Sequence, residues 1–299
     1  MSVTEALRTR LGRVGVWTNV PAIAEPAVAR EVAAEIEELG YGALWYPEAV
    51  WKESFSVAAL VLSWTNRLVV ASGITNIYAR DATSAASGSK TLADAYPGRF
   101  VLGLGCSHEP LVQMRGHVYG RPVSTMRAYL DAMDSAPYMA HEPAEPAPRL
   151  LAALGPRMLD LAAERTAGAH PYFVPVEHTA FARERLGPEP FLAVEQSVIL
   201  DNDETRAREV ARPFAAFYVE ADNYRRNLLR LGWAEAELAD GGSDRLLEAV
   251  VAYGDEAAIR DRVRAHLEAG ADHVCIQVLP NTDAQLGQLR ALAPALLDL

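Results

Sequence analysis

The sequence predicts an α/β fold, a closed (β/α)8 TIM barrel with a helical insertion before the eighth strand. Short apolar runs alternate along the chain with longer stretches of helical period, and eight such units follow one another. This alternation indicates a parallel sheet, because neighbouring parallel strands need a crossover that a helix supplies. The 299 residues suit such a barrel, and no Pro/Gly/Ser-rich linker divides them, so we expect one domain, 1–299. An open, doubly wound sheet is the alternative.

Eight apolar runs are the predicted strands. In chain order they are residues 14–17, 43–48, 68–73, 97–105, 149–154, 168–174, 191–200 and 273–279. Between the fourth and fifth strands, residues 136–148 carry four prolines, which predicts a loop.

Helical periodicity fills the intervals between the strands. In Pro26–Leu39 the apolar residues Val28, Val32 and Ile36 share one face, proline suits the first turn, and a glycine follows as a stop signal. We expect Pro294 to break the last helix near its end. The less regular stretch from about 221 to 242 is the predicted insertion. The other predicted helices are residues 54–65, 82–96, 122–134, 157–165, 179–186, 203–220, 255–269 and 283–297.

Composition narrows the class of protein. Half of the residues are hydrophobic and the net charge is -11 with no basic run, so nucleic acid is not an expected partner. The two cysteines lie far apart and show no metal-type spacing with histidine, so we expect no disulfide framework, no bound metal and a reducing compartment. No stretch has the apolar length of a signal peptide or a membrane span, which makes a cytoplasmic location without a membrane partner the expectation.

Polar and aromatic residues gather at the predicted carboxyl ends of the strands, where (β/α)8 barrels carry their active sites. For the first four strands the candidates are Trp17, Glu48, Trp51, Gly73, Ile74, Thr75, Tyr78, Gly105, Cys106, Ser107 and His108. The next two strands contribute Leu154, Gly155, Pro156, Arg157 and Tyr172. The helix that begins there would present free N–H groups and its dipole to an anion. The last two strands carry Glu195, Gln196 and Gln277.

Each candidate also has a purely structural interpretation. Glu48 suits a solvated loop or a helix cap, and Cys106 suits a small buried apolar position. The glycines at 103 and 105 are also explained by close packing, and many helices begin with proline without binding anything. The run GLGCSH lacks the last glycine of the Rossmann fingerprint, and the sequence contains no P-loop, H-E-x-x-H or G-x-S-x-G motif.

Five stretches together carry a family resemblance: LGYGALWYPE, ASGITNIYARD, TLADAYPGRFVLGLGCSHEP, LGPRMLDLAAERTAGAHPYFV and LEAGADHVCIQVL. With them the chain resembles the luciferase-like monooxygenase superfamily, and specifically its coenzyme F420-dependent oxidoreductases, from about Gly12 to Leu279. The most specific feature is A-Y-P-G-R-F-x-L-G-L-G after a strand that ends in Gly-Ile. The resemblance implies a barrel, usually dimeric, with a flavin or deazaflavin ring at the carboxyl ends of its strands.

The resemblance also implies roles for individual residues. A cis peptide bond between Gly73 and Ile74 would support the ring, with Thr75 at its edge. Further ring contacts would come from Gly105, Cys106 and Ser107, and phosphate contacts from Leu154, Gly155, Pro156 and Arg157. Some relatives carry a carboxylate at the position of His108, so either His108 or Glu48 is expected to exchange a proton with the substrate. The expected substrate wall is Trp17, Trp51, Tyr78 and Tyr172.

The sequence-based hypothesis is therefore an F420-dependent oxidoreductase that moves a hydride between the deazaflavin C5 and a small organic substrate. An FMN-dependent monooxygenase that uses O₂ and a partner reductase is the first alternative. A barrel that binds a flavin or deazaflavin without catalysis is the second. The expected assembly is a homodimer.

Overall fold

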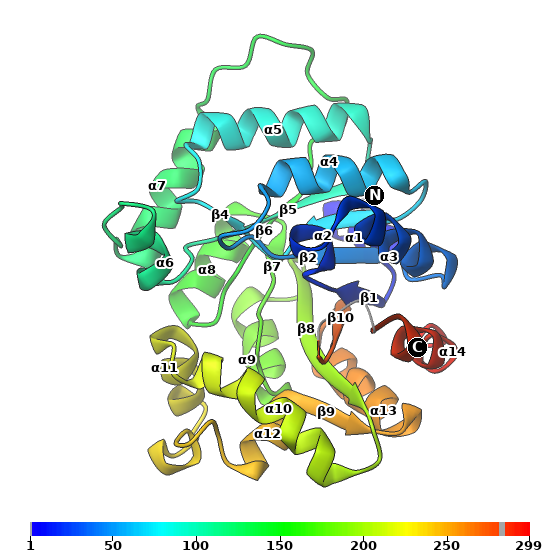
Figure 1. Ribbon diagram of the computed structural model, residues 1–299. Helices are drawn as coiled ribbons and strands as arrows, with labels where there is room; N and C mark the ends of the chain where they lie inside the picture. The colour runs from blue at the N-terminus through cyan, green and yellow to red at the C-terminus, as the bar shows by residue number, and fades with distance from the viewer. Residues whose placement is uncertain (1, 281–284) are drawn as a thin grey trace.

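Eight parallel strands form a closed barrel in the computed structural model, which describes residues 2–280 and 285–299 (Figure 1). Each strand pairs with the next in chain order, and the last pairs with both β8 and β1 to close the ring. The predicted closed barrel is confirmed and the open sheet is wrong. The barrel strands are β1 (Val14–Trp17), β2 (Ala43–Tyr46), β3 (Val69–Ser72), β5 (Phe100–Gly105), β6 (Arg149–Leu151), β7 (Gly168–Ala169), β8 (Phe191–Leu200) and β10 (His273–Val278).

Helices surround the barrel at nearly all of the predicted places. Local chemistry explains their starts: the Asp81 side chain accepts the N–H of Ser84 at 2.9 Å, for example, and so caps α5. The expected break at Pro294 is wrong, because α14 continues to Leu296; the expected start at Asp283 lies outside the described residues. The surrounding helices are α3 (Pro26–Glu38), α4 (Ser54–Trp64), α5 (Ala82–Ala95), α7 (Pro122–Asp134), α8 (Pro156–Arg165), α9 (Val176–Leu186), α13 (Glu256–Glu268) and α14 (Gln285–Leu296).

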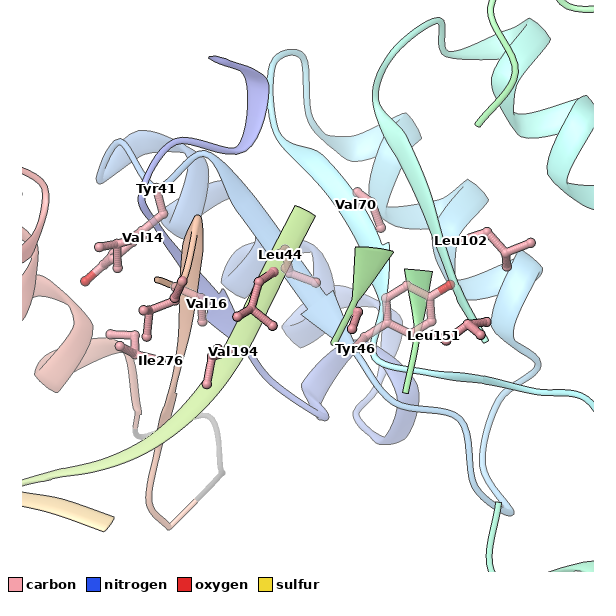
Figure 2. Close-up of a cluster of buried hydrophobic side chains, with 14 of the residues drawn as sticks. Val14, Val16, Tyr41, Leu44, Tyr46, Val70, Leu102, Leu151, Val194 and Ile276 are labelled. Carbon is pink, nitrogen blue, oxygen red and sulfur yellow. The ribbon is translucent and has the colours of Figure 1, made fainter. Parts of the chain in front are cut away.

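Alternate residues of the strands serve two separate layers of core. One set packs outward against the helices, and Figure 2 shows members of it, among them Val16, Leu44, Val70, Leu102 and Ile276. The intervening residues fill the barrel interior together with two leucines of α1 (Val3–Leu11); the interior set includes Trp17, Trp45, Ala71, Val101, Leu150, Ala193 and Cys275.

Some short elements carry no strong sequence signal and were not predicted. Helix α1 begins with a capping box between Ser2 and Glu5 and places Leu7 and Leu11 in the interior cluster. The others are α2 (Val20–Ile23), β4 (Thr75–Asn76) and α6 (Glu109–Met114). The predicted strand 168–174 is only two residues long, because the chain leaves the sheet after Ala169.

The segment between β8 and α13 is called the insertion here, and the predicted stretch of about 221–242 lies within it. It contains α10 (Glu204–Val219), α11 (Asp222–Arg230), the short 3₁₀ helix η1 (Glu235–Glu237), α12 (Asp244–Val250) and β9 (Val251–Gly254). These elements gather at one end of the molecule, away from α4 and α5 (Figure 1), and share a hydrophobic cluster with Phe173, Ile199 and Leu279. In the described part of the chain, no helix is long and apolar enough to cross a membrane.

Candidate functional site

The chain at the end of β3 is hydrogen-bonded to the segments on both sides of it. The peptide bond between Gly73 and Ile74 is cis, as the family resemblance implied. The N–H of Gly73 donates to the carbonyl of Tyr46 at 2.7 Å, and the N–H of Glu48 donates to the carbonyl of Ile74 at 3.2 Å. The next residues, Thr75 onward, form β4 and pair with the end of β5. The chain at the cis bond is therefore tied to β2 and β5.

Two glycines of β5 let this segment approach closely. A Cβ added at Gly103 would lie 1.9 Å from the backbone oxygen of Ser72, and one at Gly105 would lie 2.5 Å from Cδ1 of Ile74. The Ser72 hydroxyl also bonds both backbone groups of Gly103, at 2.9 and 3.0 Å. The packing interpretation of these glycines is confirmed, whereas contact of Gly105 with a cofactor stays a prediction.

Glu48 is the centre of a buried ion pair. Its side chain is 3% exposed and that of its partner Arg80 is 9% exposed. The guanidinium donates to both carboxylate oxygens, with Nη1 to Oε2 at 2.8 Å. Backbone N–H groups of Ser54 and Asn76 donate to the same carboxylate, at 3.2 and 2.8 Å. These four bonds fit a residue that fixes the loop after β2 against the end of β3; proton exchange by Glu48 stays a prediction.

Two buried nitrogen atoms converge on Gly73. Trp17 is 5% and His170 is 1% exposed, and neither Trp17 Nε1 nor His170 Nε2 has a hydrogen-bond partner in the described part of the chain. A Cβ at Gly73 would lie 2.8 Å from the first and 2.9 Å from the second. Tyr172 packs on Trp17 with ring centroids 5.2 Å apart. Two of the four residues predicted for the substrate wall, Trp17 and Tyr172, thus lie together beside the cis bond.

The chemistry of the two nitrogens is complementary. His170 Nδ1 lies 3.0 Å from the carbonyl oxygen of Ala193, which can only accept, so Nδ1 carries the hydrogen and Nε2 is an acceptor. Burial lowers the pKa of His170 to about 4, which keeps the ring neutral. Trp17 Nε1 is a donor. A hydroxyl group or a water molecule, which both accepts and donates, fits such a pair.

Glu195 of β8 is an ionisable strand residue to which the sequence assigned no catalytic or binding role. It is fully buried, and its carboxyl accepts the Ser197 hydroxyl at 2.7 Å and the Phe173 N–H at 3.1 Å. Burial raises its pKa to about 7, against the opposing effect of these two bonds. The available signal was a single acidic residue in an otherwise apolar run, FLAVEQSVIL.

His108 is brought into contact with the insertion. Its ring lies 5.7 Å from that of Tyr224 of α11, and Asn223 of the same helix is near enough to influence its pKa. Burial lowers the pKa of His108, although Asn223 acts in the other direction. The Tyr224 ring also lies 6.4 Å from that of Tyr172. An aromatic chain therefore joins His108 to the residues beside the cis bond.

The segment after β6 ends in a helix start without a side-chain cap. Gly155 is the N-cap residue of α8 and Pro156 occupies the first turn. The Leu154 carbonyl accepts from Nε2 of the buried His178 at 2.9 Å. Arg157 is exposed at the second helical position. This arrangement fits the predicted phosphate contacts but does not test them.

The remaining predicted residues lie in β4 or in the segments that follow β2, β4 and β5. Burial raises the pKa of Cys106 to about 12, so its thiol is protonated. Ser107 has a left-handed backbone (φ 58°), and the Tyr78 hydroxyl accepts the N–H of Gly120 at 2.9 Å. The Thr75 hydroxyl bonds that of Ser54 at 2.7 Å, and Trp51 is 46% exposed beyond β2. Within residues 2–280 and 285–299, no group of three or more His, Cys, Asp or Glu could hold a metal ion.

Two curated proteins with similar sequences are named for coenzyme F420 or pterin chemistry. A 5,10-methylenetetrahydromethanopterin reductase of Methanolobus tindarius is 26% identical over 61% of this chain and 64% of its own length. The chain thus spans slightly less than two thirds of that relative. A Mycobacterium tuberculosis protein, provisionally assigned as a coenzyme F420-dependent oxidoreductase, is 24% identical over 94% of this chain and 96% of its own length.

Solved structures show the same fold at lower sequence identity. The coenzyme F420-dependent tetrahydromethanopterin reductase of Methanopyrus kandleri superposes with a TM-score of 0.76 at 18% identity, over 96% of this chain and 99% of that one. The oxygenating constituent of 3,6-diketocamphane monooxygenase of Pseudomonas putida, in complex with FMN, gives 0.69 at 13% identity over 94% and 95%. A family model described as luciferase-like monooxygenase matches residues 10–273. The chain therefore belongs to the luciferase-like monooxygenase family.

Proposed function

We propose that this chain is an F420-dependent oxidoreductase that transfers a hydride between the deazaflavin C5 and a small organic substrate. The observation that carries the proposal is the convergence of Trp17 Nε1 and His170 Nε2 on Gly73, both buried and without partners in the described part of the chain. Buried polar groups normally have partners, so this pair indicates a bound hydroxyl or water. A (β/α)8 barrel binds its reactants at this end of the strands.

The residues around the pair fit a ring with an anionic tail. Gly73 and Ile74 would support the ring and the start of α8 would hold its phosphate, as in the sequence-based hypothesis. When bound, the deazaflavin supplies the hydride chemistry. The protein's own contribution is to orient the two reactants and to exclude water with the buried Trp17 and the partly buried Tyr172. This fit is compatible with the sequence relative that is named for coenzyme F420 and also with the structural neighbour that binds FMN.

The proton of the reaction is best assigned to His108 or Glu195. Glu48, the third candidate, already accepts four hydrogen bonds, two of them from Arg80. Burial lowers the pKa of His108, so its ring is neutral near pH 7 and available as an acceptor. The pKa of Glu195, about 7, is suited to proton exchange at neutral pH. We favour His108, because Glu195 is completely enclosed.

Cofactor titration tests the proposal directly. We expect the protein to quench the fluorescence of F420 with a saturable curve and to leave that of FMN unchanged. Binding of FMN alone would favour a monooxygenase that uses O₂ and a partner reductase. Binding without turnover on alcohols, ketones and other small substrates, with no effect of His108→Ala, would favour a non-catalytic barrel. One domain over residues 1–299, a homodimer and a cytoplasmic location belong to the same proposal.

A further inference from the structure

We infer that α11, in the insertion, supplies Arg230 and Asn227 as phosphate ligands that complete the anion site at the start of α8. The inference rests on the proposed function, because the phosphate is that of the bound cofactor. It adds a second element to the site: the segment 154–157 comes from the barrel, whereas α11 comes from the insertion.

The guanidinium of Arg230 faces the first turn of α8. Its Nη2 atom lies 3.6 Å from the position that a Cβ on Gly155 would occupy, and Nη1 and Cζ lie 4.0 Å from it. Gly155 is the N-cap residue and provides no side-chain acceptor for the N–H groups behind it. The helix dipole and the guanidinium therefore attract negative charge at the same place.

Asn227 supplies an unpaired donor beside this guanidinium. Its Oδ1 accepts from Arg230 Nη1 at 3.0 Å, which turns the amide toward the arginine. The residue is only 1% exposed, yet its Nδ2 has no partner among the residues that the structure describes. An unpaired buried N–H group is costly, so a ligand oxygen at this point is the simplest partner.

The charge of the site comes from Arg230 and is not neutralised by an acidic side chain. In the described part of the chain no carboxylate pairs with Arg230, whereas Arg226, one turn earlier, pairs with Asp222 at 2.7 Å. His178 lies close by; burial lowers its pKa to about 4, with a smaller contribution from the charge of Arg230, so it adds no positive charge. A guanidinium, an amide N–H and the helix start form a donor set for phosphate.

The test compares two ligands that differ in the phosphate tail: F420 and the deazaflavin nucleoside that lacks it. Affinities are measured by fluorescence titration with the purified full chain. We expect Arg230→Ala to weaken F420 binding by about 10- to 100-fold and nucleoside binding by less than about twofold, since charged hydrogen bonds to the tail are lost. Asn227→Asp, which places a carboxylate in the site, should have the same selective effect. Arg226→Ala is the matched control and should change neither affinity.

The outcomes separate the inference from the proposed function. If the wild-type chain binds F420 and Arg230→Ala binds it equally well, or loses both ligands equally, the inference is wrong while the proposed function stands. If the wild-type chain binds neither deazaflavin, the proposed function fails and the inference fails with it. Circular dichroism of each variant checks folding, and Arg230→Gln replaces Arg230→Ala if the shorter side chain does not fold.

Discussion

The buried carboxyl of Glu195 gives a pH-dependent prediction that needs no knowledge of the ligand. Its partners are the Ser197 hydroxyl and the Phe173 N–H, and neither carries a charge. In Glu195→Gln the amide oxygen can still accept from Phe173, while the amide N–H₂ can donate to the Ser197 oxygen. The substitution therefore removes the ionisable proton and keeps the shape and both hydrogen bonds.

The expected magnitude follows from the pKa. Folding raises the pKa of Glu195 from 4.5 to about 7. The carboxyl therefore ionises at a higher pH in the folded protein than in the unfolded chain. The contribution of Glu195 to stability consequently falls as the pH rises from about 4.5 to about 7, and this loss is constant above that. Because each pKa step of one is worth about 1.4 kcal/mol, the full loss is about 3 kcal/mol.

Differential scanning fluorimetry at pH 4.5 and pH 8 measures this loss. We expect the two proteins to have nearly the same Tm at pH 4.5, and Glu195→Gln to melt about 5 °C higher at pH 8, for a 299-residue chain. Other groups titrate identically in both proteins, so their effects cancel in the difference. A Tm difference that is the same at both pH values would refute the reasoning, since it would mean that the carboxyl ionises normally.

Three further predictions use the same structure. Gly103→Ala should prevent soluble expression, because its Cβ would lie 1.9 Å from the Ser72 backbone oxygen; a soluble variant with a wild-type Tm would contradict this. Arg80→Ala should lower the free energy of unfolding by about 3–5 kcal/mol, measured in urea, because Glu48 is left buried without its partner; a loss below about 1 kcal/mol would argue against a buried pair. Burial lowers the pKa of His266 to about 3, so His266→Gln should reduce the loss of stability on acidification from pH 6.5 to pH 4, and an unchanged acid profile would count against it.

The barrel was predictable because its signals are local. Apolar runs and helical periods are patterns of residues that are close in the sequence. The strand end at Gly73 could likewise be located from the residues on either side of it in the sequence. The glycines of VLGLG also had a local interpretation, and the structure confirms that Gly105 makes room for Ile74. Helix α1 was missed because its two buried leucines contact the barrel interior, which is assembled from distant strands.

Most contacts of the candidate site could not be predicted, because they join distant segments. Glu48 and Arg80 are 32 positions apart, and each alone is typical of a solvated loop. His108 contacts the insertion only in the folded protein. The sequence around His108 therefore gives no sign of its contact with Tyr224. Glu195 was visible as an acid in an apolar run, but its altered pKa depends on complete burial between β7 and β10.

The pairing of β8 also determines how separable the insertion is. Ser197 and Val198 have strand partners on both sides, in β10 and in β9, and the outer residues Ile199 and Leu200 continue beside β9 alone. A shortened chain without the insertion would leave this half of β8 as a bare sheet edge, which invites aggregation. The insertion is therefore not a removable module, and grafts of it between related barrels would have to carry β8 along.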